Sequence, residues 1–289
     1  MSARWSGDWA RPAEPLPTDV EVLIPAYERP AELAVTLSGL AGQRVPDFSV
    51  IISDQTEDHP VWSQASVAAM VRVLRAQGRR VRLERHQPRR GMAEQRQFLL
   101  EQSSAPYVLF LDSDVWLEPD QLRRLHEALV ESGCGFVGAA VQGLSYLADD
   151  RPRERAVFEP WRGPVHPEKI RRGDPAFERW TLHNAANLAQ VAAEHDVPEG
   201  HWLLYKVAWV GACVMFRREA LVACGGFRFW NDLPDDHTGE DVLAEWRVME
   251  RWGGAGILPS GAVHLEAETT LPGRSVDAFD VVLGSPATD

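Results

Sequence analysis

The 289-residue sequence contains few cysteines, two lysines and no long apolar run. The cysteines, Cys134, Cys213 and Cys224, form no pair with the spacing of metal ligands. Their odd number and apolar surroundings favour free thiols, and therefore a reducing, cytoplasmic compartment. No uninterrupted apolar stretch reaches the roughly 18 residues of a spanning helix, and residues 1–17 lack a signal-peptide core. We therefore expect no transmembrane segment, although peripheral membrane contact stays open.

Positive charge is also scarce, since the formal net charge is -12. An acidic surface repels the phosphates of nucleic acid, so the charge argues against a nucleic-acid partner. Apolar residues make up 45% and charged residues 25%, which are ordinary values for a globular protein. Length and composition thus predict a well-packed chain of one large or two small domains.

The sequence alternates between strand-like and helix-like segments. Short apolar runs alternate with stretches whose apolar residues recur at helical spacing, a pattern typical of a doubly wound α/β fold with a mainly parallel sheet. Strands are expected at 20–24, 48–53, 81–83, 107–111, 136–141, 207–217, 257–258 and 262–264. Helices are expected from Pro30 through Leu40 and at 61–76, 91–103, 119–131, 182–195, 219–224 and 241–252.

Polar residues follow the first, second and fourth predicted strands. In a parallel sheet, ligands bind beyond the carboxyl ends of the strands, so these residues are expected to line one edge. They are Tyr27 and Glu28, Asp54, and Asp112 with Asp114.

Asp112-Ser113-Asp114 directly follows the strongest strand signal, Tyr-Val-Leu-Phe-Leu. Two neighbouring carboxylates repel each other unless a hard divalent cation joins them. Such a cation could also neutralise a leaving diphosphate. The simpler alternative is an Asp-rich turn. The preceding strand and the other acidic strand ends favour the metal.

Four weaker signals accompany this motif. Asp54 could accept from a base N–H or a ribose hydroxyl, or it could only form an Asx turn. Residues 91–96 open a helix behind a run of arginines, which suits a diphosphate, although a solvated basic face is equally simple. Asp241, in Gly-Glu-Asp at a helix start, is either a cap or a general base. His264 ends a short strand and is a candidate third metal ligand.

Together these motifs resemble the inverting family 2 glycosyltransferases of the GT-A fold, over about residues 20–140 and 207–266. The resemblance implies a Rossmann-like single domain, a nucleotide-sugar donor that is expected to be UDP-linked, and a divalent cation, Mn²⁺ or Mg²⁺. It also implies donor-binding residues: Pro25, Ala26, Tyr27, Glu28, Asp54, Gly91, Arg96, Asp112 and Ser113.

The same resemblance implies that Asp112, Asp114 and His264 serve the metal and that Asp241 is the general base. The Gln-x-x-Arg-Trp signature of processive members is missing, because Glu245-Trp246-Arg247 does not reproduce it. A single transfer per acceptor is therefore expected. The acceptor is left open among small molecules, glycans and peptides.

The chain is expected to divide into segments with different tasks. The 145–206 insertion interrupts the strand–helix rhythm, and its aromatic residues include Trp161, Trp180 and Trp202. They either contact the acceptor or pack a lid. The segments are an N-terminal arm (1–18), a nucleotide-sugar-binding half (19–144), the acceptor-side insertion (145–206), a catalytic half (207–270) and a peripheral tail (271–289).

Two other functions compete with sugar transfer. A nucleotidyltransferase also combines an α/β sheet with a carboxylate-bound metal. It typically has a Gly-rich basic loop after the first strand, where this sequence has Pro-Ala-Tyr-Glu-Arg-Pro. A non-catalytic nucleotide-sugar-binding protein would not need Asp112, Asp114, Asp241 and His264 together.

Overall fold

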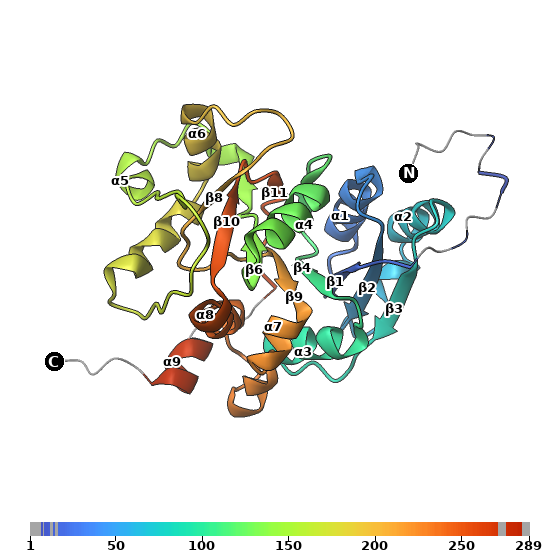
Figure 1. The fold of residues 1–289 in the computed structure, drawn as a ribbon. Coiled ribbons are helices and arrows are strands. Elements are labelled where there is room, and N and C mark those ends of the chain that lie inside the picture. The colour runs from blue at the N-terminus through green and yellow to red at the C-terminus, as the bar shows by residue number, and fades with distance from the viewer. Residues whose placement is uncertain (1–6, 8, 12–13, 15–16, 271–275, 285–289) are drawn as a thin grey trace.

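The structure, a computed structural model, describes residues 7, 9–11, 14, 17–270 and 276–284 (Figure 1). In this part of the chain, eight strands form one sheet with helices on both faces. The strand order is β3 (Val81–Arg85), β2 (Phe48–Asp54), β1 (Val20–Ala26), β4 (Tyr107–Leu111), β9 (Cys213–Arg217), β6 (Phe136–Gly138), β10 (Gly254–Leu258) and β8 (Leu203–Tyr205). A small second sheet contains β5 (Val115–Leu117), β11 (Ala262–His264) and β7 (Gln142–Gly143).

The large sheet is mainly parallel. The first four strands pair in parallel, and so do β6 and β10. β9 runs antiparallel between β4 and β6, and β8 runs antiparallel at the edge beside β10. The predicted α/β class with a mainly parallel sheet is confirmed.

Nine α-helices and four short 3₁₀ segments accompany the strands in the described residues. The helices are α1 (Pro30–Gly42), α2 (Ala65–Ala76), α3 (Met92–Gln102), α4 (Gln121–Ser132), α5 (Pro152–Arg155), α6 (Asn187–Glu194), α7 (Arg218–Ala223), α8 (Glu240–Trp252) and α9 (Ala278–Leu283). The 3₁₀ segments are η1 (Val61–Ser63), η2 (Leu144–Tyr146), η3 (Pro175–His183) and η4 (Arg228–Asp232). None of the described helices is long and apolar enough to cross a lipid bilayer.

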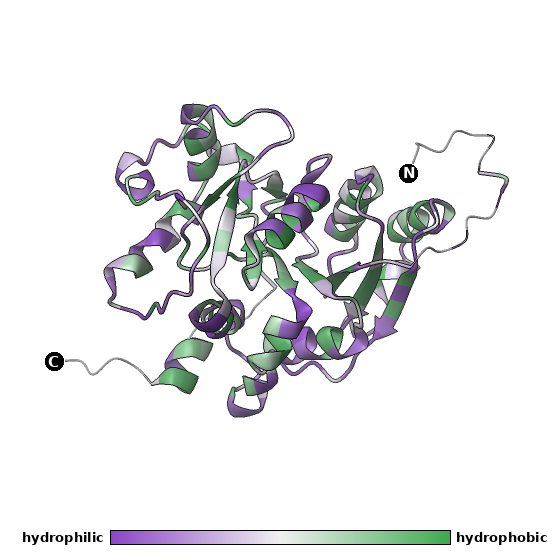
Figure 2. Ribbon diagram, viewed as in Figure 1, coloured by the Kyte–Doolittle hydropathy of each residue, from purple (hydrophilic) through white to green (hydrophobic). Residues whose placement is uncertain are grey.

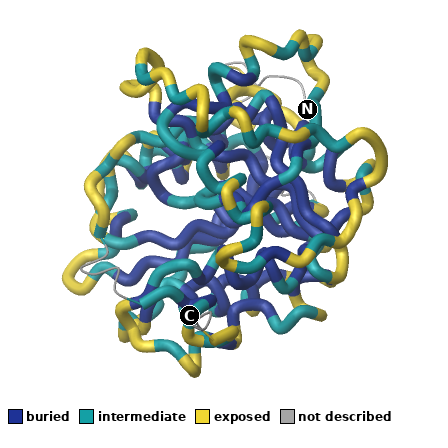
Figure 3. The backbone as a smooth tube through the Cα atoms, turned by 90° about the vertical axis from the view of Figure 1, so that its left-hand side faces the viewer, coloured by how far each residue is buried: buried dark blue, intermediate teal, exposed yellow. Residues whose placement is uncertain are grey.

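Two apolar cores cover the two faces of the sheet, because successive strand residues point to opposite faces. Val22 and Ile24 of β1 join a core with α1, α2 and α4, whereas Leu23 joins a second core with α3, α7 and α8. Figure 2 shows β2 as a strongly hydrophobic strand, and Figure 3 shows that the buried residues lie at the centre of the molecule. Burial on both faces explains the near-continuous apolar runs in the sequence.

The elements around the second half of the sheet differ from the prediction. The strand expected at 207–217 is shorter and comprises only β9, because side chains of α8 form hydrogen bonds with the backbone of the preceding residues. The indole Nε1 of Trp246 donates to the carbonyl of Ala208 over 2.9 Å, and the N–H of Val210 donates to Glu245 over 2.8 Å. The strand expected at 136–141 likewise ends at Gly138. The helix expected at 182–195 is preceded by the 3₁₀ turns of η3 and begins only at Asn187.

The described part of the C-terminal tail packs on the body of the protein, so its expected peripheral position is wrong. Ala278 and Phe279 are buried, and the ring of Phe279 lies 5.1 Å from that of Trp246. The backbones of Thr238 and Asp277 pair in an isolated parallel β-bridge. Residues 271–275 and 285–289, and most of the predicted N-terminal arm, lie outside the described residues.

Candidate active site

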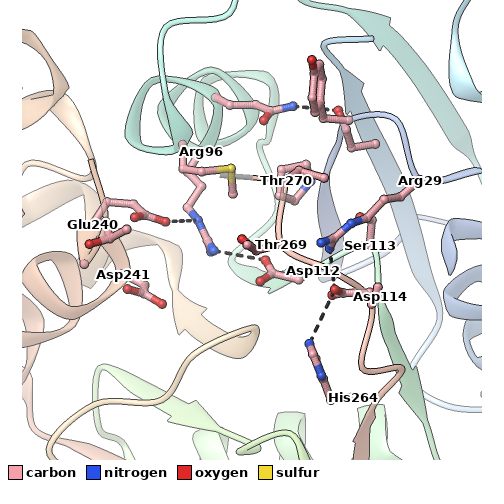
Figure 4. A pocket seen from close by; sticks show the side chains of 18 of the residues that line it. Arg29, Arg96, Asp112, Ser113, Asp114, Glu240, Asp241, His264, Thr269 and Thr270 are labelled. Atoms are coloured by element: carbon pink, nitrogen blue, oxygen red, sulfur yellow. Dashed lines mark hydrogen bonds and ion pairs between the residues drawn. The ribbon is translucent and has the colours of Figure 1, made fainter. Parts of the chain in front are cut away.

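A cavity of about 540 Å³ opens at the carboxyl ends of β1 and β4 (Figure 4). The loops after these two strands, the first turns of α3 and α8, and the segment after β11 form its walls. The structure therefore brings together segments from distant parts of the sequence. Nine of the predicted site residues line this cavity: Pro25, Ala26, Tyr27, Arg96, Asp112, Ser113, Asp114, Asp241 and His264.

Asp114 is the centre of a buried group of charges. Its Oδ2 lies 2.5 Å from Nη1 of Arg29 and 3.5 Å from Nε2 of His264. The N–H of Leu265 donates to the carbonyl of Asp114 over 2.9 Å, which fixes the end of β11 beside this aspartate. Burial alone would raise the pKa of Asp114, but contact with His264 and Arg29 lowers it. The same contact with Asp114 raises the pKa of His264.

Asp112 belongs to a second charged group, built around the buried guanidinium of Arg96. Nη2 of Arg96 lies 3.1 Å from Asp112, and its Nε lies 3.1 Å from Glu240, the first residue of α8. Burial raises the pKa of Asp112 to about 6, against the opposing effect of Arg96. Burial and the neighbouring Asp241 raise the pKa of Glu240 to about 7. Burial would lower the pKa of Arg96, but the surrounding carboxylates raise it.

Asp114 and His264 are suitably placed to share a divalent cation. Two ligands that are each about 2.1 Å from an octahedral ion lie about 3 Å apart, close to the 3.5 Å between Oδ2 and Nε2. The positive guanidinium of Arg29 contacts the same oxygen of Asp114, and it approaches that oxygen from a different side than His264 (Figure 4). Asp112 does not join a ready-made cluster, since no group of three acidic, histidine or cysteine side chains among the described residues has metal-binding geometry. Its predicted part in the metal site stays a prediction.

Asp241 lies in the first turn of α8, at a wall of the cavity. Its Oδ1 accepts from the N–H of Val242 over 2.8 Å. Its Oδ2 faces the chain at Gly211, where an added β-carbon would lie 3.5 Å from that oxygen. The carboxylate is thus part of the helix start and is also directed toward open space, so capping and proton transfer are compatible.

Three of the predicted donor-binding residues do not line the cavity. Both carboxylate oxygens of Asp54 accept hydrogen bonds from its own turn, at Thr56 and Val61, which is the Asx-turn alternative. The N–H of Glu28 donates to Thr56. Gly91 instead makes room for a histidine, because at φ +89° any β-carbon would lie 2.4 Å from the ring of His237. Contact of these three with the donor stays a prediction.

Several cavity residues were not predicted from the sequence. Arg29 directly follows Tyr27 and Glu28 in the same loop, so its place in the sequence could have identified it as a cavity residue. The residues after β11 have no sequence pattern of their own and reach the cavity only through the fold. The additional lining residues are Arg29, Met92, Gln95, Thr238, Gly239, Glu240, Ala267, Thr269, Thr270 and Asp277.

The three tryptophans of the 145–206 insertion have different surroundings. Trp161 and Trp202 pack against the core on the α1 face of the sheet. Trp180 lines a second cavity of about 590 Å³, which also borders Asp241. The packing alternative therefore holds for two of these indoles.

Comparison with known sequences identifies one family. The profile described as Glycosyl transferase family 2 matches residues 21–188, more than half of the chain. This stretch includes Asp112 and Asp114 and ends before Asp241 and His264. An uncharacterized glycosyltransferase from Haemophilus influenzae is 26% identical over 113 residues, which are 39% of this chain and 35% of that protein. The chain thus spans about a third of the length of this curated relative.

Solved structures share the fold. Residues 1–349 of TarS from S. aureus, in complex with UDP-GlcNAc, match with a TM-score of 0.54 at 14% identity, over 87% of this chain and 60% of that chain. A mannosyltransferase from Pyrobaculum calidifontis, in complex with GDP-Man and Mn²⁺, matches with a TM-score of 0.50 at 18% identity, over 86% of this chain and 61% of that chain. At these identities the likeness concerns the fold alone.

Proposed function

Because the chain belongs to glycosyl transferase family 2, we propose that it transfers one sugar from a nucleoside-diphosphate sugar to a hydroxyl group of an acceptor. One observation carries the proposal. A single cavity combines paired aspartates, two arginines and Asp241, which is the set of groups that diphosphate departure and proton removal require.

The donor is proposed to lie across the carboxyl ends of β1 and β4. Pro25, Ala26 and Tyr27 form the β1 side of the cavity, which suits the nucleotide base. The guanidinium of Arg89 stacks on the ring of Tyr27 at 4.2 Å and holds that side in place. Arg29 and Arg96 stand on either side of the Asp112–Asp114 turn, where they can bind diphosphate oxygens. UDP is the first nucleotide to test.

The carboxylate and imidazole groups at this site fit a resident divalent cation, Mn²⁺ or Mg²⁺. Asp114 and His264 would hold it, with the remaining ligands supplied by diphosphate oxygens and water, as is usual for such ions. When bound, the cation would stabilise the negative charge of the departing diphosphate.

Asp241 is proposed to remove the proton from the acceptor hydroxyl. The acceptor oxygen then forms a bond to the anomeric carbon while the bond from that carbon to the diphosphate oxygen breaks. The proton ends on Asp241, and the electron pair leaves with the nucleoside diphosphate. In this mechanism the acceptor oxygen attacks the face opposite the departing diphosphate, so the anomeric configuration is inverted.

A donor screen tests this function directly. Purified protein is incubated with Mn²⁺ or Mg²⁺ and with each of several UDP- and GDP-linked sugars, and the release of nucleoside diphosphate is measured. We expect release from at least one donor, abolished by EDTA and about 10²–10⁴-fold slower in Asp241→Asn. If no donor is cleaved, and none raises the melting temperature, the proposed function is wrong. Release of pyrophosphate instead would indicate nucleotidyl transfer.

A further inference from the structure

The second cavity, of about 590 Å³, lies on the other side of Asp241 from the donor cavity. Both cavities are lined by Thr238, Gly239, Asp241 and Asp277. These four residues therefore form a common wall, and Asp241 is the one among them proposed to move a proton.

Aromatic rings dominate the remaining walls of this cavity. Trp180 and Trp209 are parallel, with an interplanar angle of 3° and ring centroids 6.3 Å apart. Phe177 packs against Trp209 at 5.4 Å, and Phe279 completes the lining from α9. Half-buried indoles offer flat apolar faces on which another ring can stack.

The backbone that presents Trp209 is fixed on both sides. The residue before it accepts from the indole of Trp246, and the residue after it donates to Glu245. Glu245 is fully buried, and burial raises its pKa well above the ordinary value. Gly211, two residues after Trp209, lies beside Oδ2 of Asp241. The indole of Trp209 and the proposed base are thus held in a fixed relation.

The charges around the cavity disfavour anions. Its ionisable lining residues are Arg172, Asp241 and Asp277. Arg172 is already engaged, with Nη2 2.8 Å from Asp277 and Nη1 3.3 Å from Asp280. A negatively charged group would therefore meet an excess of carboxylates.

We propose that this cavity is the acceptor site and that it selects a neutral acceptor whose reactive hydroxyl is carried on or next to a ring with an apolar face, which stacks on Trp180 and Trp209. The shared chemistry is an apolar ring face, which a pyranose or an aromatic alcohol can supply. Identifying the bound ring as an acceptor rests on the proposed sugar transfer. Binding of a ring in this cavity does not depend on turnover.

The test uses protein labelled with 5-fluorotryptophan and observed by ¹⁹F NMR. The resonances of the two indoles are assigned from Trp180→Phe and Trp209→Phe. Methyl β-D-glucopyranoside and benzyl alcohol are titrated as ring probes, with glycerol as the open-chain control. We expect one or both ring probes to shift these two resonances, and glycerol to leave them unchanged. Which probe acts distinguishes a sugar ring from an aromatic ring.

Substitutions connect the binding to the named side chains. Trp180→Leu and Trp209→Leu are expected to weaken probe binding about tenfold, equal to about 1.4 kcal/mol. Trp161→Leu is the matched control, because this indole belongs to the same insertion and packs away from the cavity. The unchanged ¹⁹F signals of the other tryptophans show that each variant is folded.

The outcomes separate this inference from the proposed function. If a donor is cleaved but neither ring probe perturbs Trp180 or Trp209, the acceptor site is elsewhere and the inference is wrong. An equal effect of Trp161→Leu on probe affinity also overturns it. If ring probes bind as expected while no donor is ever cleaved, the ring-binding cavity stands and the proposed function fails.

Discussion

Arg96→Met is expected to lower the free energy of unfolding by about 3–5 kcal/mol, the usual cost of breaking a buried ion pair on one side. The side chain of Arg96 is 5% exposed, and it contacts both Asp112 and Glu240 at 3.1 Å. Removing the guanidinium leaves a carboxylate on α8 buried with no compensating charge. Methionine keeps most of the volume, so little of the loss comes from a cavity.

Equilibrium urea unfolding at pH 8 in EDTA measures this loss without interference from divalent metal. The double variant Arg96→Met with Glu240→Gln is expected to recover part of the stability, because the second change removes the uncompensated charge. The loss should also shrink as the pH falls toward 5. Glu240 has a raised pKa in the folded protein, so protonation favours the folded state as the pH drops through about 7 toward the unfolded value of 4.5.

Arg123→Met is the matched control for an exposed pair. Arg123 lies 2.6 Å from Glu127 on α4, but the glutamate is 44% exposed, so the change should cost less than about 1 kcal/mol. The reasoning would be refuted if Arg96→Met and Arg123→Met were equally stable, or if Glu240→Gln gave no recovery at any pH.

Three further predictions concern single residues. Asp114→Ala should abolish Mn²⁺-dependent binding of UDP in calorimetry, and undiminished binding would remove Asp114 from the metal site. Asp241→Asn should fold and bind the donor normally but turn over about 10²–10⁴-fold more slowly, and a wild-type rate would reduce Asp241 to a helix cap. His183 is held neutral by burial, which lowers its pKa to about 4, so wild-type stability should fall as the pH drops from 6.5 to 4. Urea unfolding of His183→Gln should lack about 2–3 kcal/mol of that fall, and identical pH profiles would contradict the assignment.

The sequence predicts the first half of the fold well because its signals there are local. β1, β2 and β4 are buried on both faces, so each appears as an apolar run bounded by polar residues. The turn after β4 carries two aspartates separated by one serine, and the structure places both at the cavity. Neighbouring residues of this kind can be recognised without knowledge of tertiary contacts.

The missed features depend on contacts between distant segments. The stretch 207–212 is apolar like a strand, but backbone groups of Ala208 and Val210 form hydrogen bonds with side chains of α8. These contacts exist only in the folded chain. Asp54 has the sequence context of a ligand-binding residue, yet its oxygens are used within seven residues of chain. Trp161 packs against the core and Trp180 faces a cavity. The composition of the segment does not distinguish these two environments.

The antiparallel position of β9 has a consequence for the growing chain. β9 fills the place beside β4, although about 100 residues separate the two strands in the sequence. At a synthesis rate of about 5–20 residues per second, the edge of β4 stays without its partner for roughly 5–20 s. An unpaired apolar strand edge invites association with other chains. A fragment ending at residue 144 would keep that edge open permanently, so residues 19–144 are expected to aggregate when they are produced alone.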